Sequence, residues 1–301
     1  MSDFIQLVVS GVALGCLYAL VALSFVIVLR ATGVFNIVQG GVVLFSAYLV
    51  YDFHVSWGLP FGVALLLTVI LCTAAVVLLD RVLFRPITSH GSGHGQFFAV
   101  LLVGVGLLTV CDGLVVAIWG SQPLSEDDPW GLSKITLGSI ALTSRDLSVI
   151  GITLVLLLAF WYLLQRTRIG VGMRAVASDP EAARVQGINP AVISAVAWIC
   201  ATIAAVLAGV MLGTAVGGGI NSTIDQVSFL ALPALILGGA GSIGGCVLGG
   251  IVLGVLQSLA AGYAPASFGS GFGQVVPWVV MIIILVIRPS GLLGSRQVRR
   301  A

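Results

Sequence analysis

The segment QRTRIGVGMRAVASDPEAARVQGINP, residues 165–190, is the one long polar interruption with clustered basic residues in an otherwise apolar chain. Asp179 can cap the start of a helix, Pro180 suits a first helical position, and Gly187 suits the position just past a helix end. These signals predict a helix of about two turns over residues 180–186. A capped helix at the surface of a very apolar protein is expected to contact a partner.

The composition excludes a soluble protein. Hydrophobic residues make up 59% of the 301 residues and charged residues 8%, whereas soluble domains carry about 25% charged residues. The apolar runs are long and lack the period-two alternation of a membrane β-barrel, so helices are the expected spanning elements. The sequence therefore predicts an all-α integral membrane protein, a polytopic helical bundle in the lipid bilayer. The net charge of +2 gives no indication of a nucleic-acid partner.

The apolar stretches have the length that membrane crossing requires, which is about 20 residues for a helix. One of them, residues 227–262, is interrupted by the glycine-rich sequence GGAGSIGG at 238–245. We therefore predict about eight or nine transmembrane segments, with a glycine-broken pair at 227–262. The other spans are residues 4–29, 34–51, 58–80, 97–119, 147–164, 191–214 and 272–288.

The basic residues predict the orientation, because they favour the cytoplasmic side of a membrane protein. If the N-terminus is outside, only Lys134 and Arg145 of the basic residues lie outside. The basic residues that then lie inside are Arg30, Arg81, Arg85, Arg166, Arg168, Arg174, Arg184, Arg288, Arg296, Arg299 and Arg300. This bias predicts an external N-terminus, a cytoplasmic C-terminus, a cytoplasmic loop at 165–190 and an external loop at 120–147.

The same topology constrains the broken stretch 227–262. Asp225 would lie outside and the C-terminal arginines inside, so this stretch must leave and return to the same side. Two arrangements satisfy that condition: two short spans with a cytoplasmic turn at 238–245, or a re-entrant pair that never emerges. No second soluble domain is evident, so residues 1–301 are predicted to form a single transmembrane domain.

Neither a catalytic site nor a metal site is predicted. The sequence GAGSIG at 239–244 fits a dinucleotide-binding pattern, but no Asp or Glu follows Asp225 to hold a ribose. The single lysine, Lys134, follows Ser133 rather than a glycine, so an ATP-binding P-loop is absent. The five cysteines lack metal-ligand spacing, and no histidine lies well inside a span to act as a base for a serine nucleophile. The chain is therefore not expected to be an enzyme.

Several polar residues and glycines lie where lipid would not favour them. Acidic residues inside a span, such as Asp112, usually face the bundle interior or a water-filled path. Structural hydrogen bonding and close helix packing are the alternative interpretations, and packing is favoured for the glycine ladders at 11/15, 209/213/217 and 241/245/249. The candidate residues of a translocation pathway are Asn36, Gln39, Gly40, Asp112, Gly239, Gly241 and Ser242.

Three stretches of the chain carry a family resemblance. They are ATGVFNIVQGGVVLFSAYL at 31–49, RTRIGVGMRAVASDPEAARVQGIN at 166–189, and FLALPALILGGAGSIGGCVLGGIVLGVLQS at 229–258, which the tail IRPSGLLG at 287–294 follows. Together with the spacing of the spans, they resemble the LivH-type permease subunit of branched-chain amino acid ABC importers. The resemblance covers nearly the whole chain.

The resemblance implies a permease domain of the type II ABC importer kind in a bacterial inner membrane. Such a subunit works with a second related permease, two ATP-binding subunits and an extracytoplasmic solute-binding protein. No cofactor is expected on this chain, since ATP and Mg would bind the partner subunits. The residues that the resemblance assigns to ATPase coupling are Asp179, Pro180, Glu181, Ala182, Ala183, Arg184 and Gly187.

The resemblance implies inward transport of a small solute, with a branched-chain or other amino acid as the first expectation. One departure bears on the solute, because many relatives carry His-Gly-Glu where this chain has Gln39-Gly40-Gly41. Relatives of this architecture also import urea, short amides or aromatic acids, so these solutes stay open as alternatives. A self-sufficient channel or secondary transporter is the remaining alternative.

Overall fold

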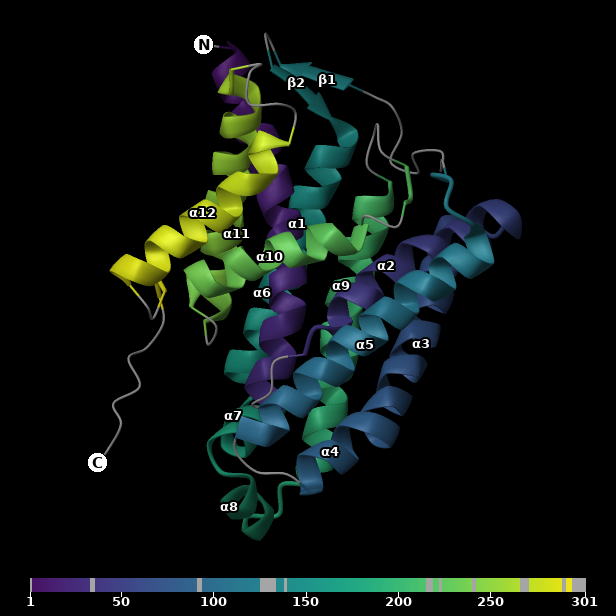
Figure 1. Ribbon diagram of the computed structural model, residues 1–301, viewed down its shortest axis with the longest axis vertical. Helices are drawn as coiled ribbons and strands as arrows, with labels where there is room; N and C mark the ends of the chain where they lie inside the picture. The colour runs from purple at the N-terminus through teal and green to yellow at the C-terminus, as the bar shows by residue number, and fades with distance from the viewer. Residues whose placement is uncertain are drawn as a thin grey trace. The chain divides into compact units, whose positions relative to one another are not determined.

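The computed structural model describes residues 2–32, 36–90, 94–124, 134–137, 140–214, 219–221, 224–239, 242–265, 271–288 and 291–293. Over these residues the chain is almost entirely helical (Figure 1), which confirms the predicted fold class. The elements are α1 (Ser2–Thr32), α2 (Val38–Tyr51), η1 (Asp52–Ser56), α3 (Phe61–Leu79), η2 (Asp80–Phe84), α4 (Arg85–His90), α5 (His94–Trp119), β1 (Lys134–Leu137), β2 (Ile140–Thr143), α6 (Ser144–Arg166), α7 (Arg168–Ser178), α8 (Pro180–Val185), α9 (Pro190–Gly213), α10 (Ile224–Gly238), α11 (Ile243–Tyr263) and α12 (Phe272–Ile287).

The apolar helices have the lengths that a polytopic membrane protein requires. Within the described residues, seven helical stretches are long and apolar enough to cross a membrane, and two apolar helices are shorter. The seven are Asp3–Thr32, Val38–Ser56, Phe61–Ile87, Phe98–Trp119, Asp146–Arg166, Pro190–Gly213 and Ile243–Tyr263. The shorter two, Gln226–Gly238 and Phe272–Ile287, belong to α10 and α12. The sequence prediction of about eight or nine segments therefore agrees with seven long helices and two short ones.

The chain divides into two compact units, and each is described by itself. The first consists of Met1–Val26, Trp130–Leu157 and Val227–Ala301. The second consists of Ile27–Pro129 and Leu158–Gln226. The loop 165–190 lies within the second unit, and the glycine-broken stretch 227–262 lies within the first. That residues 1–301 act as a single permease domain stays a prediction.

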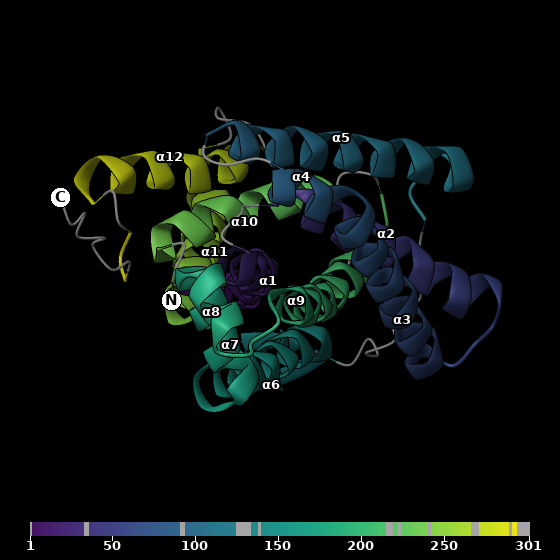
Figure 2. The same cartoon turned by 90° about the horizontal axis from the view of Figure 1, so that it is seen from below.

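Helix α2 is the central element of the second unit. It packs against α9, α3 and α5, and α3 also packs against α9 (Figures 1 and 2). Close approach to α9 requires a glycine, because a Cβ on Gly209 would lie 2.1 Å from the carbonyl oxygen of Val43. On the other side, the ring of Tyr48 packs on Trp119 of α5 with a centroid distance of 5.3 Å. Small residues of this kind allow helices to pack closely in a bilayer, where no hydrophobic force holds them together.

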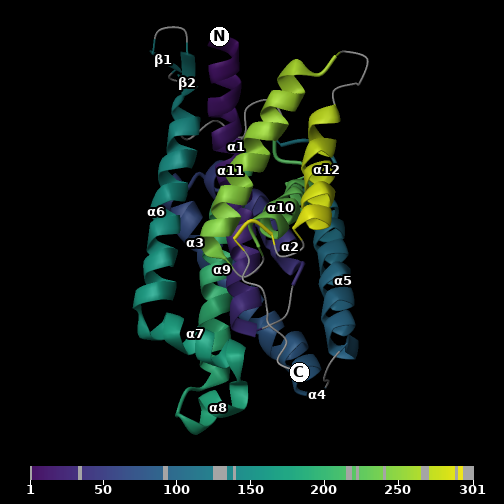
Figure 3. The ribbon, with the colours of Figure 1, turned by 90° about the vertical axis from the view of Figure 1, so that its left-hand side faces the viewer.

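Glycines also set the packing in the first unit, where α11 lies against α1 and α12 (Figure 3). A Cβ on Gly254 would lie 2.4 Å from the carbonyl oxygen of Gly11 and 2.3 Å from the nitrogen of Gly15. The Tyr18 hydroxyl donates to Gln257 Oε1 at 2.7 Å, and the Ser258 hydroxyl donates to the Leu7 carbonyl at 2.7 Å. The expectation that the glycine ladder 11/15 serves packing is confirmed here, whereas Gly217 and Gly241 of the other two ladders lie outside the described residues.

The stretch 227–262 is broken at its glycines into two helices, α10 and α11, as the sequence predicts. A Cβ on Gly238 of α10 would lie 2.1 Å from the backbone of Gly245, and one on Gly249 would lie 2.4 Å from the Ala234 carbonyl oxygen. The two helices therefore meet in close backbone contact beside the turn that joins them. Helix α10 has 15 residues, a length of about 22 Å at 1.5 Å per residue, which is short of the ~30 Å hydrocarbon core. Helix α11, with 21 residues, is long enough to cross, so only α10 falls short, and the choice between two short spans and a re-entrant pair stays a prediction.

The described residues contain one β-hairpin, in the predicted external loop 120–147. Strands β1 and β2 pair antiparallel, with Lys134 opposite Thr143 and Leu137 opposite Ile140. The hairpin belongs to the first unit and leads directly into α6. It adds a small β element to the otherwise helical described residues.

Replacing Gly254 by alanine should destabilise the packing of α1 on α11. The new methyl group has no room between Gly11 and Gly15, and such overpacking costs about 1–3 kcal/mol. Thermal unfolding of the purified protein in detergent will measure the loss. The matched control is Gly244→Ala on the same helix, where a Cβ would meet nothing within 4 Å. Equal midpoints for the two variants would contradict the packing role of Gly254.

Candidate functional site

Helix α8 forms where the sequence predicts it, and Asp179 caps its start. The Asp179 side chain accepts hydrogen bonds from the backbone N–H groups of Glu181 and Ala182, at 2.9 and 3.0 Å. Pro180 occupies the first turn, where its missing N–H leaves no hydrogen bond unmade. Asp179 also ends α7, since its N–H donates to the Ala175 carbonyl at 3.0 Å. One residue therefore sets the corner between the two helices.

The end of α8 is closed by a Schellman motif. The N–H of Gly187 donates to the Arg184 carbonyl at 2.9 Å, and the N–H of Ile188 donates to the Ala183 carbonyl at 3.0 Å. Gly187 has a φ of +82°, which a residue with a Cβ rarely adopts. The expectation of a glycine just past the helix end is confirmed, and the helix is satisfied at both ends by its own local sequence.

The surface of α8 is almost entirely exposed. Ala183 is its only buried residue, while Glu181, Ala182 and Arg184 are exposed and Val185 is 89% exposed. Figure 1 shows α8 beyond α7 and the start of α9, both of which belong to the same unit. An exposed helix with its own caps and a single anchor presents a rigid surface to another molecule.

Only residues 186–189 separate α8 from α9, a helix that is long enough to cross a membrane. Asn189 caps α9, because its side-chain oxygen accepts from the Ala191 N–H at 3.0 Å. Arg85, at the start of α4, also contacts this turn, because its Nη2 donates a hydrogen bond to the Ala191 carbonyl at 3.0 Å. The Nε of Arg85 donates to Asp80 Oδ2 at 2.8 Å, and Asp80 is 3% exposed. Arg85 thus links the first turn of α9 to the end of the α3 span.

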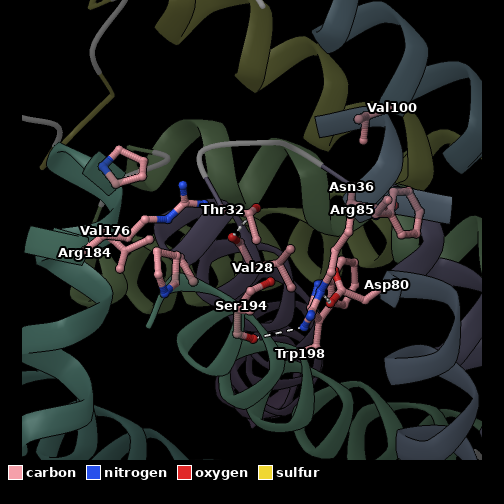
Figure 4. A pocket seen from close by; sticks show the side chains of 15 residues that line it. Val28, Thr32, Asn36, Asp80, Arg85, Val100, Val176, Arg184, Ser194 and Trp198 are labelled. Atoms are coloured by element: carbon pink, nitrogen blue, oxygen red, sulfur yellow. Dashed lines mark hydrogen bonds and ion pairs between the residues drawn. The ribbon is translucent and has the colours of Figure 1, made fainter. Parts of the chain in front are cut away.

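A cavity of about 430 Å³ lies beside this link, within the second unit (Figure 4). Phe84 stacks on Trp198 of α9 in its wall, with a ring-centroid distance of 5.6 Å. Pro180 and Arg184 of α8 also line it. The cavity therefore borders α8, the first turn of α9 and η2, which are the elements that Arg85 and the loop 165–190 connect.

The predicted pathway residues near α2 fall in the second unit. Asn36 is buried and lines this cavity. Its Oδ1 accepts a hydrogen bond from the N–H of Val38, the first residue of α2, at 2.9 Å. Gln39 is completely buried, and neither polar atom of its amide has a hydrogen-bond partner among the described residues. Gly40 is buried beside it, and Asp112 is half-buried on α5. A pathway role for these residues stays a prediction.

The other predicted pathway residues fall in the first unit, at the turn between α10 and α11. Gly239 ends α10 with a φ of +91°. Ser242 caps α11, because its hydroxyl oxygen accepts from the Gly245 N–H at 3.0 Å. Gly241 lies outside the described residues. Both described residues thus have a structural role at a helix end, and their role in a pathway stays a prediction.

Sequence reasoning missed the Arg85 link. It counted Arg85 only among the basic residues that set orientation, and it singled out neither Asp80 nor Trp198. The available signal was an acidic residue at the end of an apolar span with an arginine five positions on, Asp80 and Arg85, separated by a π-helical turn.

The described residues hold no group of three or more His, Cys, Asp or Glu side chains placed to bind a metal ion.

Comparison with known proteins identifies the family to which this chain belongs. The model of the family described as "Branched-chain amino acid transport system / permease component" matches residues 7–285. The chain is 27% identical to the high-affinity branched-chain amino acid transport system permease protein LivH of Salmonella typhimurium, over 99% of this chain and 97% of that one. It is 26% identical to the corresponding protein BraD of Pseudomonas aeruginosa, over 99% and 98%.

A more limited similarity extends to a protein with a different named solute. The nucleoside ABC transporter permease protein NupC of Lactococcus lactis is 34% identical over 162 residues, which cover 52% of this chain and 50% of that one. Because this similarity covers only about half of each chain, it does not indicate which solute this chain transports.

Removal of the α8 cap should loosen that helix without unfolding the protein. The change Asp179→Ala deletes both side-chain hydrogen bonds, and loss of an N-cap costs about 1 kcal/mol. Hydrogen exchange at the Glu181 and Ala182 amides should accelerate by roughly fivefold. Ser178→Ala is the control, because that hydroxyl donates to the Arg174 carbonyl and caps nothing. Unchanged exchange in Asp179→Ala would refute the cap.

Removal of Arg85 should leave Asp80 as a buried carboxylate without this ion pair. We expect Arg85→Gln to lower stability by roughly 1–3 kcal/mol, and Asp80→Asn in the same chain to recover part of that loss. The midpoints of thermal unfolding of the two single variants and the double variant give the coupling. Arg81→Gln, an exposed arginine of the same segment, serves as control. Additive losses would show that the pair contributes nothing.

Proposed function

The chain belongs to the family of branched-chain amino acid transport system permease components, and on that premise we propose that ATP hydrolysis on partner subunits drives it through α8. It is a multi-pass membrane permease subunit of an ABC importer. The observation that carries the proposal is the geometry of α8: an exposed helix, capped at both ends, that residues 186–189 join to a membrane span. A partner that pushes on α8 moves α9.

Transmission from α8 into the second unit follows the contacts at the start of α9. Asn189 fixes the first turn of α9, and Arg85 ties the same turn to Asp80 at the end of the α3 span. A displacement of α8 is therefore shared between α9 and α3 instead of being absorbed by a loop. Such rigid-body tilting of helices between two states is a usual way to alternate access to a transport pathway.

The partners follow from what this chain lacks and from the family. The sequence has no Gly-Lys-Ser/Thr, since its one lysine is Lys134 after Ser133, so its ATP chemistry must come from another chain. The assembly we propose has a second related permease, two ATP-binding subunits that hold ATP and Mg, and an extracytoplasmic solute-binding protein. This chain has no catalytic role in it.

The proposed orientation places the N-terminus outside and the C-terminus in the cytoplasm of a bacterial inner membrane. The excess of arginines in loops of one side supports this arrangement. Residues 1–301 then act as one permease domain, with the loop 165–190 facing the ATP-binding subunits and the loop 120–147 facing the solute-binding protein.

The proposed solute is a branched-chain or other amino acid. The names of LivH and BraD, similar over nearly their full length, support it. The partial similarity to NupC indicates that related chains serve other solutes. Urea, short amides and aromatic acids are therefore the alternatives. Competition of each compound class against labelled leucine uptake, with the cognate solute-binding protein present, will separate them.

The coupling role predicts the effect of a double change on α8. Glu181→Lys reverses an exposed charge, and Gly187→Trp places a bulky residue at a φ of +82°, so the surface and the end of α8 both change. Uptake by proteoliposomes that contain the ATP-binding subunits should be abolished, while insertion of the chain into the membrane is retained.

Two controls make this result specific. Gly62→Trp adds the same bulk to α3 at a position where a Cβ would meet nothing within 4 Å, and it should leave uptake unchanged. ATP depletion should stop uptake by the unmodified protein. Normal uptake in the α8 variant would refute coupling through this helix, and uptake that persists without ATP would favour a channel or a secondary transporter.

A further inference from the structure

A second groove, of about 600 Å³, lies where two membrane spans end. Its lining residues all belong to the second unit, at the junction of α6 and α7 and at the start of α9, and Figure 3 shows where these helices lie. The candidate span of α6 ends at Arg166, and the candidate span of α9 begins at Pro190. The groove is therefore at the level where the hydrocarbon core gives way to the polar interface.

One wall of the groove is apolar and open. Val171 of α7 is 54% exposed and Val192 of α9 is 56% exposed, and Ile193 lies between the two helices. Gly172 lets α7 approach closely, since a Cβ there would be 2.7 Å from Ile193 Cδ1. The floor is thus closed by packing, while branched apolar side chains remain available to an occupant.

The rim of the groove is basic. Arg166 is the last residue of α6 and Arg168 the first of α7, and both are exposed. Among the described residues no carboxylate forms an ion pair with either guanidinium. Arg174 differs, because it donates a hydrogen bond to the Leu164 carbonyl and braces α7 against α6. The two rim arginines are thus placed to bind an anion from outside the chain.

We propose that this groove binds one anionic phospholipid of the cytoplasmic leaflet. The phosphate of the headgroup lies between Arg166 and Arg168, and one acyl chain lies over Val171, Val192 and Ile193. Basic pockets between spans on the cytoplasmic side bind anionic headgroups by this chemistry. The choice of leaflet rests on the proposed orientation, whereas the site at a span end does not.

A lipid fits the groove better than a protein segment does. The groove combines two cations with an apolar wall at the end of membrane spans, and an anionic lipid carries both complementary parts in one molecule. A bound lipid would also hold α7 at the interface, and α7 continues through Asp179 into α8. The site is therefore positioned to influence the helix through which we propose ATP hydrolysis acts.

Photocrosslinking of the full-length chain will test this site. The chain is placed in nanodiscs of phosphatidylcholine that contain a trace of phosphatidylglycerol with a photoreactive acyl chain, and the labelled peptides are mapped. We expect label on the peptides that contain Val171 and Val192. Unlabelled phosphatidylglycerol should compete, whereas the same excess of phosphatidylcholine or inorganic phosphate should not.

Variants then test the arginines. Arg166→Gln with Arg168→Gln should reduce labelling by roughly tenfold or more, the order expected for two interfacial charges, whereas lysine at both positions should retain it. Arg81→Gln, an exposed arginine on another segment, should leave labelling unchanged. If the glutamine variant does not fold, the competition experiment on the unmodified chain still decides.

Three results would contradict binding of an anionic lipid in this groove. Competition by phosphatidylcholine would show a nonspecific apolar surface, competition by inorganic phosphate would show a site for a free anion, and loss of label on addition of the ATP-binding subunits would show a protein interface. Each of these would overturn the lipid assignment. The measurement needs no transport, so its failure is distinct from failure of the proposed function.

Discussion

The fold depends on one constraint: a peptide group in hydrocarbon finds no water, so the protein itself must supply its hydrogen-bond partner. Continuous helices meet this condition along the spans. The break between α10 and α11 meets it differently, because the chain returns to it: the N–H of Leu292 donates to the Leu237 carbonyl at 2.7 Å, and that of Leu293 to the Gly238 carbonyl at 3.3 Å. The Ser242 hydroxyl oxygen accepts from the N–H of Gly245. The last carbonyl groups of α10 before the glycine turn thus find their hydrogen-bond donors in Leu292 and Leu293.

Within that constraint, two kinds of contact organise the units. Glycines bring backbones together where only van der Waals contact is available, as Gly209 does against Val43 and Gly254 against Gly11. Charge is used sparingly and at a span end, where Arg85 binds both the buried Asp80 and the Ala191 carbonyl. The first kind fixes helices side by side. The second joins the end of one span to the start of another, next to the exposed helix α8.

Local signals predicted much of this from the sequence, and contacts between distant segments account for what they missed. The boundaries of α8 follow from Asp179, Pro180 and Gly187, whose effects act within a few residues, so the prediction was accurate there. Long apolar runs likewise located the spans. No local pattern indicates that residue 85 meets residue 191, because that contact arises only when α4 and α9 pack. The complete burial of Gln39 could not be predicted from the sequence either, because it depends on every helix that packs around this side chain.

Because its own sequence caps α8 at both ends, the residues that fix the helix differ from the residues that form its exposed surface. The frame needs Asp179 at one end, Gly187 at the other and Ala183 as the buried residue. The exposed positions Glu181, Ala182, Arg184 and Val185 contribute no side chain to that frame. Under the coupling role proposed above, those positions can change together with the ATP-binding subunit over evolutionary time, while the helix keeps its form. Paired transporter subunits can then diverge in partner choice without losing the ability to transmit force.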